Sequence, residues 1–303
     1  MADNKRIDEA TNTETVGHEW DGIEELNTPL PRWWLWTFYA TIVWGIAYTI
    51  AYPAWPMVSS ASAGVLDWSS RGQLEQELAD DSARKMPLLK AIAATPVEQL
   101  PARPQLWQAA VEGGHAAFRN NCTQCHGTGA AGTAGYPNLN DDDWLWGGDL
   151  KAIEYTIAHG VRNPEHEQTR ASQMPAFGRD GLLQPSEIAD VVAYVRTISR
   201  QQAPTAEARR GAATFATNCA ACHGATGTGN RAVGAPDLTD AIWLYGGDEA
   251  SLTNTVAYAR SGVMPRWEHK LGPTQVKMLA AYVYSLGGGE RSAVQMAEAS
   301  PRR

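Results

Sequence analysis

The chain has 303 residues, a net charge of −8 and 44% hydrophobic residues, and this length suits about two modest domains. The acidic balance argues against nucleic-acid binding, which needs a basic face, and the charged fraction of 19% argues against global disorder. Four cysteines fall in two pairs of identical spacing, so no thiol is left over.

Residues 1–32 are polar and carry eight acidic side chains. They lack a basic start, an early apolar run and a small-residue cleavage site, so they do not form a secretory signal. We predict a cytoplasmic N-terminal tail that is disordered over residues 1–20. Residues 21–31 are more apolar, which suits contact with the membrane surface or with a partner.

Residues 33–56 are predicted to form a transmembrane anchor. The stretch from Trp33 to Tyr52 has no charge, and one helix of about twenty residues spans the hydrocarbon core. Aromatic residues gather near both ends, as they do at membrane interfaces, and Pro53 and Pro56 then end the helix. Its three threonines can bond backward along the helix or face a partner helix.

Residues 57–107 are predicted to form a linker. The segment from Leu66 to Leu78 has helical character, and four prolines from Pro87 to Pro104 then interrupt the chain. We expect the linker to pack partly on a domain or another subunit, because apolar side chains such as Ile92 would otherwise be exposed.

The remaining chain repeats itself. A shift of 97 residues aligns Gly114 with Gly211 and the first cysteine pair with the second, and a shift of 99 then aligns Trp144 with Trp243. The conserved order of these matches predicts two copies of one domain, 108–202 and 203–290, followed by a C-terminal tail, 291–303.

Each copy is predicted to be helical. A first helix precedes the cysteines, a middle helix follows a Gly-Gly-Asp turn whose aspartate can cap it, and a last helix begins after Pro185 or Pro273. The last helices carry Tyr194 and Tyr282 on their apolar faces. We expect these tyrosines, with Trp144 and Trp243, to pack around a cofactor.

The cysteine motif predicts that cofactor. Cys-x-x-Cys-His is the attachment signature of c-type haem. Two thiols three residues apart can form thioethers with the two vinyl groups of one haem, and the adjacent histidine then ligates the iron. The two copies are Cys122, Cys125 and His126, and Cys219, Cys222 and His223.

Three other interpretations of these cysteines are less well supported by the sequence. A four-cysteine zinc site needs pairs about 15–20 residues apart, and a thioredoxin-like site needs a βαβ context. A disulfide leaves both histidines unexplained. Two covalently bound haems c are therefore the predicted cofactors.

The sixth iron ligand is expected downstream in each repeat. Met174 and Met264 occupy equivalent loop positions, each followed by proline, and a methionine–histidine pair raises the haem potential for electron transfer. The rivals are His159 and His166 in the first repeat and His269 in the second. We predict the two methionines as ligands, each within its own repeat.

With both axial positions filled by protein, the haem iron has no open site for oxygen, peroxide or nitrite. No Ser-His-Asp set, phosphate loop or flavin fingerprint appears in the sequence, and so no catalytic residue is predicted. The chain is thus expected to be an electron carrier. Because haem is attached to this motif outside the bacterial inner membrane, residues 57–303 are predicted to be periplasmic.

The two repeats resemble class I cytochrome c domains, which implies an all-α fold of one N-terminal transmembrane helix and two tandem cytochrome c domains. The N-terminal region makes the resemblance more specific. Its matching features are the acidic tail, Asp-Gly-Ile-Glu-Glu-Leu-Asn-Thr-Pro-Leu-Pro at 21–31, Arg32-Trp33-Trp34 and Tyr-Pro-Ala-Trp-Pro at 52–56. Nearly the whole chain is similar to the dihaem subunit, subunit III, of cbb3-type cytochrome c oxidases.

This resemblance implies that electrons from a donor cytochrome c pass through the two haems to the monohaem subunit. They then reach the catalytic haem–copper subunit of a proton-pumping oxidase. Two alternatives stay open: a stand-alone membrane-anchored dihaem cytochrome, and a cytochrome subunit of a periplasmic dehydrogenase. A haem-based sensor is a further class, which would need an open iron site.

Overall fold

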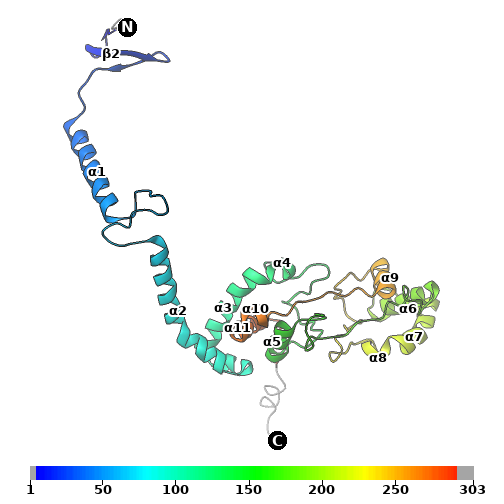
Figure 1. Ribbon diagram of the computed structural model, residues 1–303. Helices are drawn as coiled ribbons and strands as arrows, with labels where there is room; N and C mark the ends of the chain where they lie inside the picture. Colours follow the sequence, from blue (N-terminus) through cyan, green and yellow to red (C-terminus); the bar gives the residue numbers. More distant parts are fainter. Residues whose placement is uncertain (1–4, 292–303) are drawn as a thin grey trace. The chain divides into compact units, whose positions relative to one another are not determined.

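The computed structural model describes residues 5–291, and the chain divides into two units, Met1–Arg84 and Lys85–Arg303. Helices dominate the described residues, as expected for an N-terminal span followed by cytochrome c domains (Figure 1). The predicted C-terminal tail lies almost wholly outside the described residues. The helices longer than one turn are α1 Arg32–Ala51, α2 Ser70–Ala94, α3 Pro104–Asn121, α5 Leu150–His159, α6 Pro185–Ile198, α7 Ala206–Asn218, α9 Glu249–Tyr258 and α11 Pro273–Ser285.

The N-terminal region is ordered into a small sheet, so the expectation of disorder over residues 1–20 is wrong for its described part. Strands β1 Ile7–Asp8, β2 Thr13–Trp20 and β3 Ile23–Leu26 pair antiparallel in sequence order. Asp21 and Gly22 both have positive φ and join β2 to β3. Asp-Gly is a strong signal for a two-residue hairpin turn, and the acidic composition of the tail concealed it.

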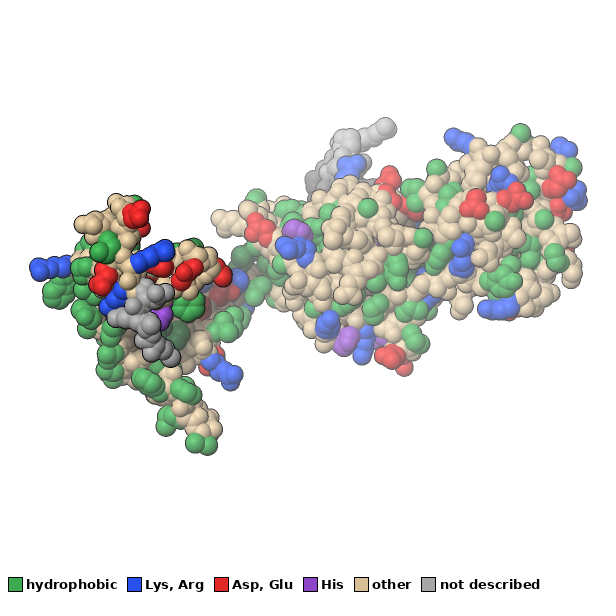
Figure 2. Space-filling view, turned by 90° about the horizontal axis from the view of Figure 1, so that it is seen from above, with side chains coloured by type: hydrophobic (Ala, Val, Ile, Leu, Met, Phe, Trp, Pro, Cys, Tyr) green, Lys and Arg blue, Asp and Glu red, His purple; other side chains and the backbone are tan. Residues whose placement is uncertain are grey.

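Helix α1 is long and apolar enough to cross a membrane, and none of its residues is buried in the protein. Figure 2 shows hydrophobic side chains exposed on the surface, and those of α1 include Trp36 at 73% and Val43 at 68% exposure. The hydroxyl groups of Thr37, Thr41 and Thr49 each donate to a carbonyl three or four residues earlier in the helix. These bonds follow the backward bonding described above for the threonines. They give each hydroxyl group a hydrogen-bond partner, which the lipid hydrocarbon does not provide.

The linker is more helical than its prolines predict. Pro87 lies inside α2, although a proline removes one helical hydrogen bond. After α2, the 3₁₀ segment η1 Val97–Ala102 leads to α3. Ile92 and Leu100 are fully buried, so this part of the linker packs on the haem-motif repeats as expected.

Each repeat contains the three predicted helices. The Asp149 side chain accepts bonds from two N–H groups at the start of α5, and Asp248 accepts one at the start of α9. Helix α6 begins at Pro185, where Gln184 and Glu187 form a capping box, and α11 begins at Pro273. Local capping thus accounts for the helix boundaries.

The packing of these helices does not follow the sequence repeats. Helices α3 and α5 of the first repeat form one core with α11 of the second, and we call this the first core. Helices α7 and α9 of the second repeat form the second core with α6 of the first. Figure 1 shows α3, α5, the short helix α10 Glu268–Leu271 and α11 together at one end of this unit, and α6, α7 and α9 at the other.

Close helix contacts seal both cores. At Gly114 in α3, an added Cβ would lie 2.6 Å from the Met278 carbonyl carbon and 2.8 Å from the Tyr282 Cβ in α11. At Gly211 in α7, it would lie 2.8 Å from the Val191 N in α6. Glycine at these equivalent positions is what lets the helix pairs approach.

One aromatic ring anchors each core. Phe118 in the first core and Phe215 in the second are each 1% exposed, and burial of such a side chain stabilises a fold by about 1.5–3 kcal/mol. Phe118 lies against Tyr282, with ring centroids 5.2 Å apart, and Phe215 lies against Tyr194 at 5.1 Å. The predicted tyrosines therefore lie beside the helices that lead into the cysteine motifs.

Candidate haem sites

Both cysteine motifs adopt the same short helical turn. Cys122 is the C-cap of α3 and also the N-cap of α4, Thr123–His126. Cys219 stands in the same way between α7 and α8, Ala220–His223. The N–H of each motif histidine donates to the carbonyl of its first cysteine at 2.9 Å. This turn holds two thiols and one imidazole together, as attachment and ligation of a haem require.

The motif histidines are oriented by a loop that follows them. The Nδ1 atom of His126 lies 3.1 Å from the carbonyl oxygen of Pro137, and Nδ1 of His223 lies 3.1 Å from that of Pro236. A carbonyl acceptor fixes the tautomer with hydrogen on Nδ1, which leaves the Nε2 lone pair for a metal. Pro137 and Pro236 align in the repeat, but their positions in the sequence alone do not indicate this role.

Burial favours the neutral form of the motif histidines, which is the form that ligates iron. Burial lowers the pKa of both His126 and His223, although the bond to the proline carbonyl opposes the shift. The imidazoles are therefore neutral near pH 7 and able to coordinate. Burial also raises the pKa of the Cys122 and Cys219 thiols to about 11, and the neighbouring cysteine adds to each shift.

The four cysteines are all described and form no disulfide with one another. Cys122 and Cys219 are half-buried against their cores, whereas Cys125 and Cys222 are exposed. The donor set at each motif, two separate thiols and a neutral imidazole with a free Nε2, fits a c-type haem.

The two methionines lie in the cores opposite to those expected. Met264, from the second repeat, packs against the first core, as Cys122 does. Met174, from the first repeat, packs against the second core together with Cys219. Each was expected near the motif of its own repeat, and the exchanged packing of the last helices carries both methionine loops across.

The rival histidine ligands of the first repeat contact each other. His159 Nδ1 lies 2.8 Å from His166 Nε2, and the rings stack with centroids 5.1 Å apart. Burial and the neighbouring His166 lower the pKa of His159. His166 also faces Arg266, whose Nη1 lies 3.4 Å from its Nδ1. These contacts favour a structural role for the pair.

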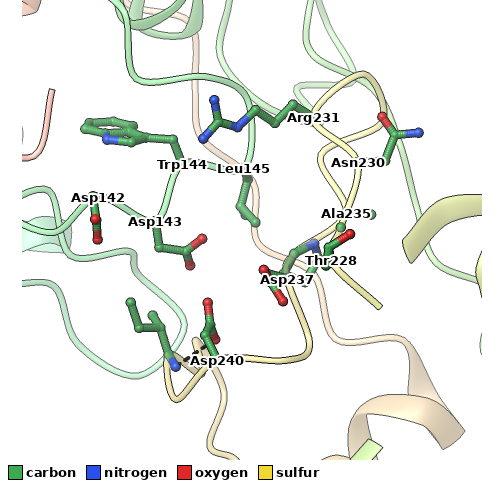
Figure 3. A pocket seen from close by; sticks show the side chains of 13 residues that line it. Asp142, Asp143, Trp144, Leu145, Thr228, Asn230, Arg231, Ala235, Asp237 and Asp240 are labelled. Carbon is green, nitrogen blue, oxygen red and sulfur yellow. Dashed lines mark hydrogen bonds between the residues drawn. The ribbon is translucent and has the colours of Figure 1, made fainter. Parts of the chain in front are cut away.

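Loops after the two cysteine motifs enclose a polar pocket of about 600 Å³, shown in Figure 3. Asp143, Asp237 and Asp240 line it together with Arg231. Burial raises the pKa of Asp143 to about 6, and Asp240 is the next largest cause. None of the eight predicted site residues lines this pocket, but Trp144 and Pro236, whose carbonyl orients His223, both do.

Three family models match successive parts of the chain. Residues 12–59 match the N-terminal domain of cytochrome oxidase-cbb3, FixP. Residues 111–199 match cytochrome c, and residues 206–283 match the cbb3-type subunit III of cytochrome c oxidase. The matches cover the anchor and both repeats, and they indicate c-type haem.

Full-length relatives are similar over almost the whole chain. A cbb3-type cytochrome c oxidase subunit CcoP from Cereibacter sphaeroides is 52% identical over 276 residues, covering 91% of this chain and 95% of the relative. A cbb3-type subunit FixP from Bradyrhizobium sp. (strain ORS 278) is 52% identical over 293 residues, covering 96% of this chain and 100% of the relative. A FixP subunit from Rhizobium meliloti (strain 1021) is 51% identical over 291 residues, with coverages of 96% and 100%.

Proposed function

The chain belongs to the CcoP/FixP family of cbb3-type cytochrome c oxidase subunits, and we propose that it carries electrons to the catalytic core of such an oxidase through two covalently bound haems c. The observation that carries this proposal is the duplicated motif geometry. In both repeats a proline carbonyl lies 3.1 Å from Nδ1 of the motif histidine, which leaves Nε2 for iron.

The protein groups that hold each haem are the motif residues. Cys122 and Cys125 would bind one haem covalently through thioethers, and His126 would ligate its iron; Cys219, Cys222 and His223 would do the same for the other. Met174 and Met264 would supply the remaining iron ligands, which would raise the potential relative to bis-histidine ligation. When bound, each haem supplies a centre that accepts and releases one electron.

The rest of each core controls the surroundings of the haem. Phe118 and Phe215 are buried next to the motif turns and keep water from one side of each site. Trp144 packs against the first core, where its Nε1 donates to the Gly288 carbonyl at 2.7 Å, and Trp243 packs against the second. These fixed apolar walls limit the reorganisation that accompanies a change of charge on iron.

The partners follow from the family. A donor cytochrome c reduces this chain, which passes electrons to the monohaem cytochrome c subunit and then to the catalytic haem–copper subunit of a proton-pumping oxidase. Helix α1 anchors the chain in the bacterial inner membrane. The N-terminus is cytoplasmic, and both haem-binding repeats lie in the periplasm, where haem is attached.

Purification of the tagged full-length chain in detergent tests this proposal. We expect two haems c per chain, together with haem b and copper from the catalytic subunit, and oxygen consumption driven by reduced cytochrome c. Replacing Cys122 and Cys125 by alanine should remove one haem c and at least most of that activity. Gly129→Ala is the control, because nothing lies within 4 Å of its added Cβ. Purification without haem b and copper would contradict the oxidase assignment.

A further inference from the structure

The N-terminal sheet has no apolar core among the residues that the structure describes. None of the apolar side chains in β1, β2 and β3 is buried, and the buried residue of the three strands is Thr15, which is 2% exposed. Backbone hydrogen bonds hold the sheet, together with local contacts such as that of the Arg6 N–H with the Thr15 hydroxyl at 3.2 Å. Small sheets without apolar burial are marginally stable in water, so this sheet lacks the apolar contact that a covering surface would provide.

An apolar pair stands at the tip of the sheet. Trp20 and Ile23 lie directly opposite each other in β2 and β3, on either side of the Asp21–Gly22 turn. Opposed residues in neighbouring strands project on the same face. Each of the two side chains is 71% exposed. Tryptophan is among the residues that most often anchor protein interfaces, so the turn presents a preformed apolar contact.

Acidic side chains flank this pair in the sequence. Residues 5–31 contain seven acidic and two basic residues, which gives a net charge of −5. Arg6 neutralises one of the carboxylates, because its Nε lies 3.1 Å from Glu24 Oε2. Glu19 and Glu25 are exposed and form no ion pair with any described residue. The tip therefore combines an apolar pair with uncompensated negative charge, which suits a partner surface rich in Lys and Arg.

A short connection keeps the sheet at the membrane. Strand β3 ends at Leu26, and α1, which is apolar enough to cross a membrane, begins at Arg32. An extended chain spans at most about 3.6 Å per residue, so residues 27–31 keep the end of the sheet within about 20 Å of α1. An anionic cytoplasmic leaflet repels a segment of charge −5, whereas the cytoplasmic loops of multi-span membrane proteins carry an excess of Lys and Arg. Such loops therefore fit the sheet better than lipid headgroups do.

We propose that the N-terminal sheet docks on Lys- and Arg-rich cytoplasmic loops of the multi-span catalytic subunit, with Trp20 and Ile23 at the centre of the contact and acidic side chains such as Glu19 at its rim. This inference rests on the proposed function, which supplies the oxidase complex and the cytoplasmic N-terminus. It adds a protein contact outside the membrane, far from both haem motifs in the sequence. The sheet then takes no part in haem attachment and acts in assembly with the catalytic subunit.

Photo-crosslinking of the full-length chain in its native membranes tests the contact. With p-benzoylphenylalanine in place of Ile23, irradiation should yield an adduct with the catalytic subunit, and mass spectrometry should locate the bond in a cytoplasmic loop of that subunit. The same group in place of Glu9 is the control and should give little adduct, because Glu9 is exposed between β1 and β2, away from the turn at the tip. No adduct, adducts with lipid alone or with another protein, or equal yields from the two positions would overturn the proposal.

Charge reversal at the rim separates the docking from the proposed function. With p-benzoylphenylalanine at position 23, Glu19→Lys should lower the yield of the adduct about tenfold, because the added lysine meets a cationic surface. Glu19 lies opposite Glu24 in the sheet, so the lysine replaces a like-charge pair and does not weaken the fold. Glu9→Lys, the matched control, should leave the yield unchanged, and both variants should keep two haems c per chain. An unchanged yield in Glu19→Lys would overturn the docking alone, whereas purification of the unaltered chain without haem b would contradict the oxidase assignment.

Discussion

Replacement of Gly114 by alanine tests the contact between α3 and α11 that closes the first core. The new Cβ would lie 2.6 Å from the Met278 carbonyl carbon and 2.8 Å from the Tyr282 Cβ, where ordinary contact needs about 3.4 Å or more. Backbone atoms of α11 cannot rotate away, so the helices must separate. Overpacking of this kind costs about 1–3 kcal/mol.

Gly113, one residue earlier in α3, provides a matched control. An added Cβ there meets only the end of the Met278 side chain, which can adopt another rotamer. Replacing a glycine in the middle of a helix by alanine stabilises the fold by about 0.5–1 kcal/mol. Gly113→Ala is therefore expected to be neutral or mildly stabilising. That gain is common to both variants, so they should differ by the overpacking cost of about 1–3 kcal/mol in the free energy of unfolding.

Urea unfolding followed by tryptophan fluorescence measures this difference. With a denaturant dependence of about 2 kcal/mol/M, the unfolding midpoint of Gly114→Ala should lie about 0.5–1.5 M below that of Gly113→Ala. Equal midpoints would refute the close packing of α3 on α11. They would also refute the argument that glycine is required at this contact.

Three further predictions concern other parts of the haem-motif unit. Lys277→Met should destabilise the fold by about 1–2 kcal/mol, because its ammonium group donates to carbonyls at the end of α2, including that of Thr95 at 2.7 Å; exposed Lys151→Met is the control in the same urea assay. Asp149→Ala should lower stability by about 1 kcal/mol, since its carboxylate caps two N–H groups of α5, and the urea midpoint again reports it. Asp143→Asn should raise the midpoint at pH 7.5 and have less effect near pH 4. The raised folded-state pKa of about 6 means that the wild-type acid loses stability as pH rises from about 4 to 6. An equal effect of the asparagine at both pH values would contradict that sign.

The sequence predicts best those features that local chemistry determines. The helix starts at Asp149 and Pro185 follow from capping and proline preferences, and the structure places α5 and α6 there. The internal repeat likewise indicates the paired motif turns. The Asp21–Gly22 dipeptide is also a local signal for a hairpin turn, but the acidic composition around it favours a disordered tail.

Tertiary pairing is less accessible to sequence reasoning. Pro87 carries a local signal to break a helix, yet α2 continues through it to a buried end at Ile92. Predicting that Met264 packs against the first core requires knowing which last helix covers which first helix. The first helices of the two repeats present similar surfaces to both last helices, α6 and α11. Composition and periodicity therefore do not predict which helices pair.

Chain connectivity supplies a physical reason for the exchanged packing. Only residues 199–205 separate α6 from α7, and consecutive elements joined by a short connection usually pack as neighbours. Helix α6 accordingly lies on α7, where an ion pair joins Asp190 to Arg210 at 2.7 Å. The place on the second repeat that α11 would take within its own repeat is then filled. Because α11 still has an apolar face to bury, it packs on α3. The last helix of the first repeat, α6, does not cover α3 because it already packs on α7. The same connection that makes α6 and α7 neighbours thus sends Met174 to the second core and leaves the first core to be completed by Met264.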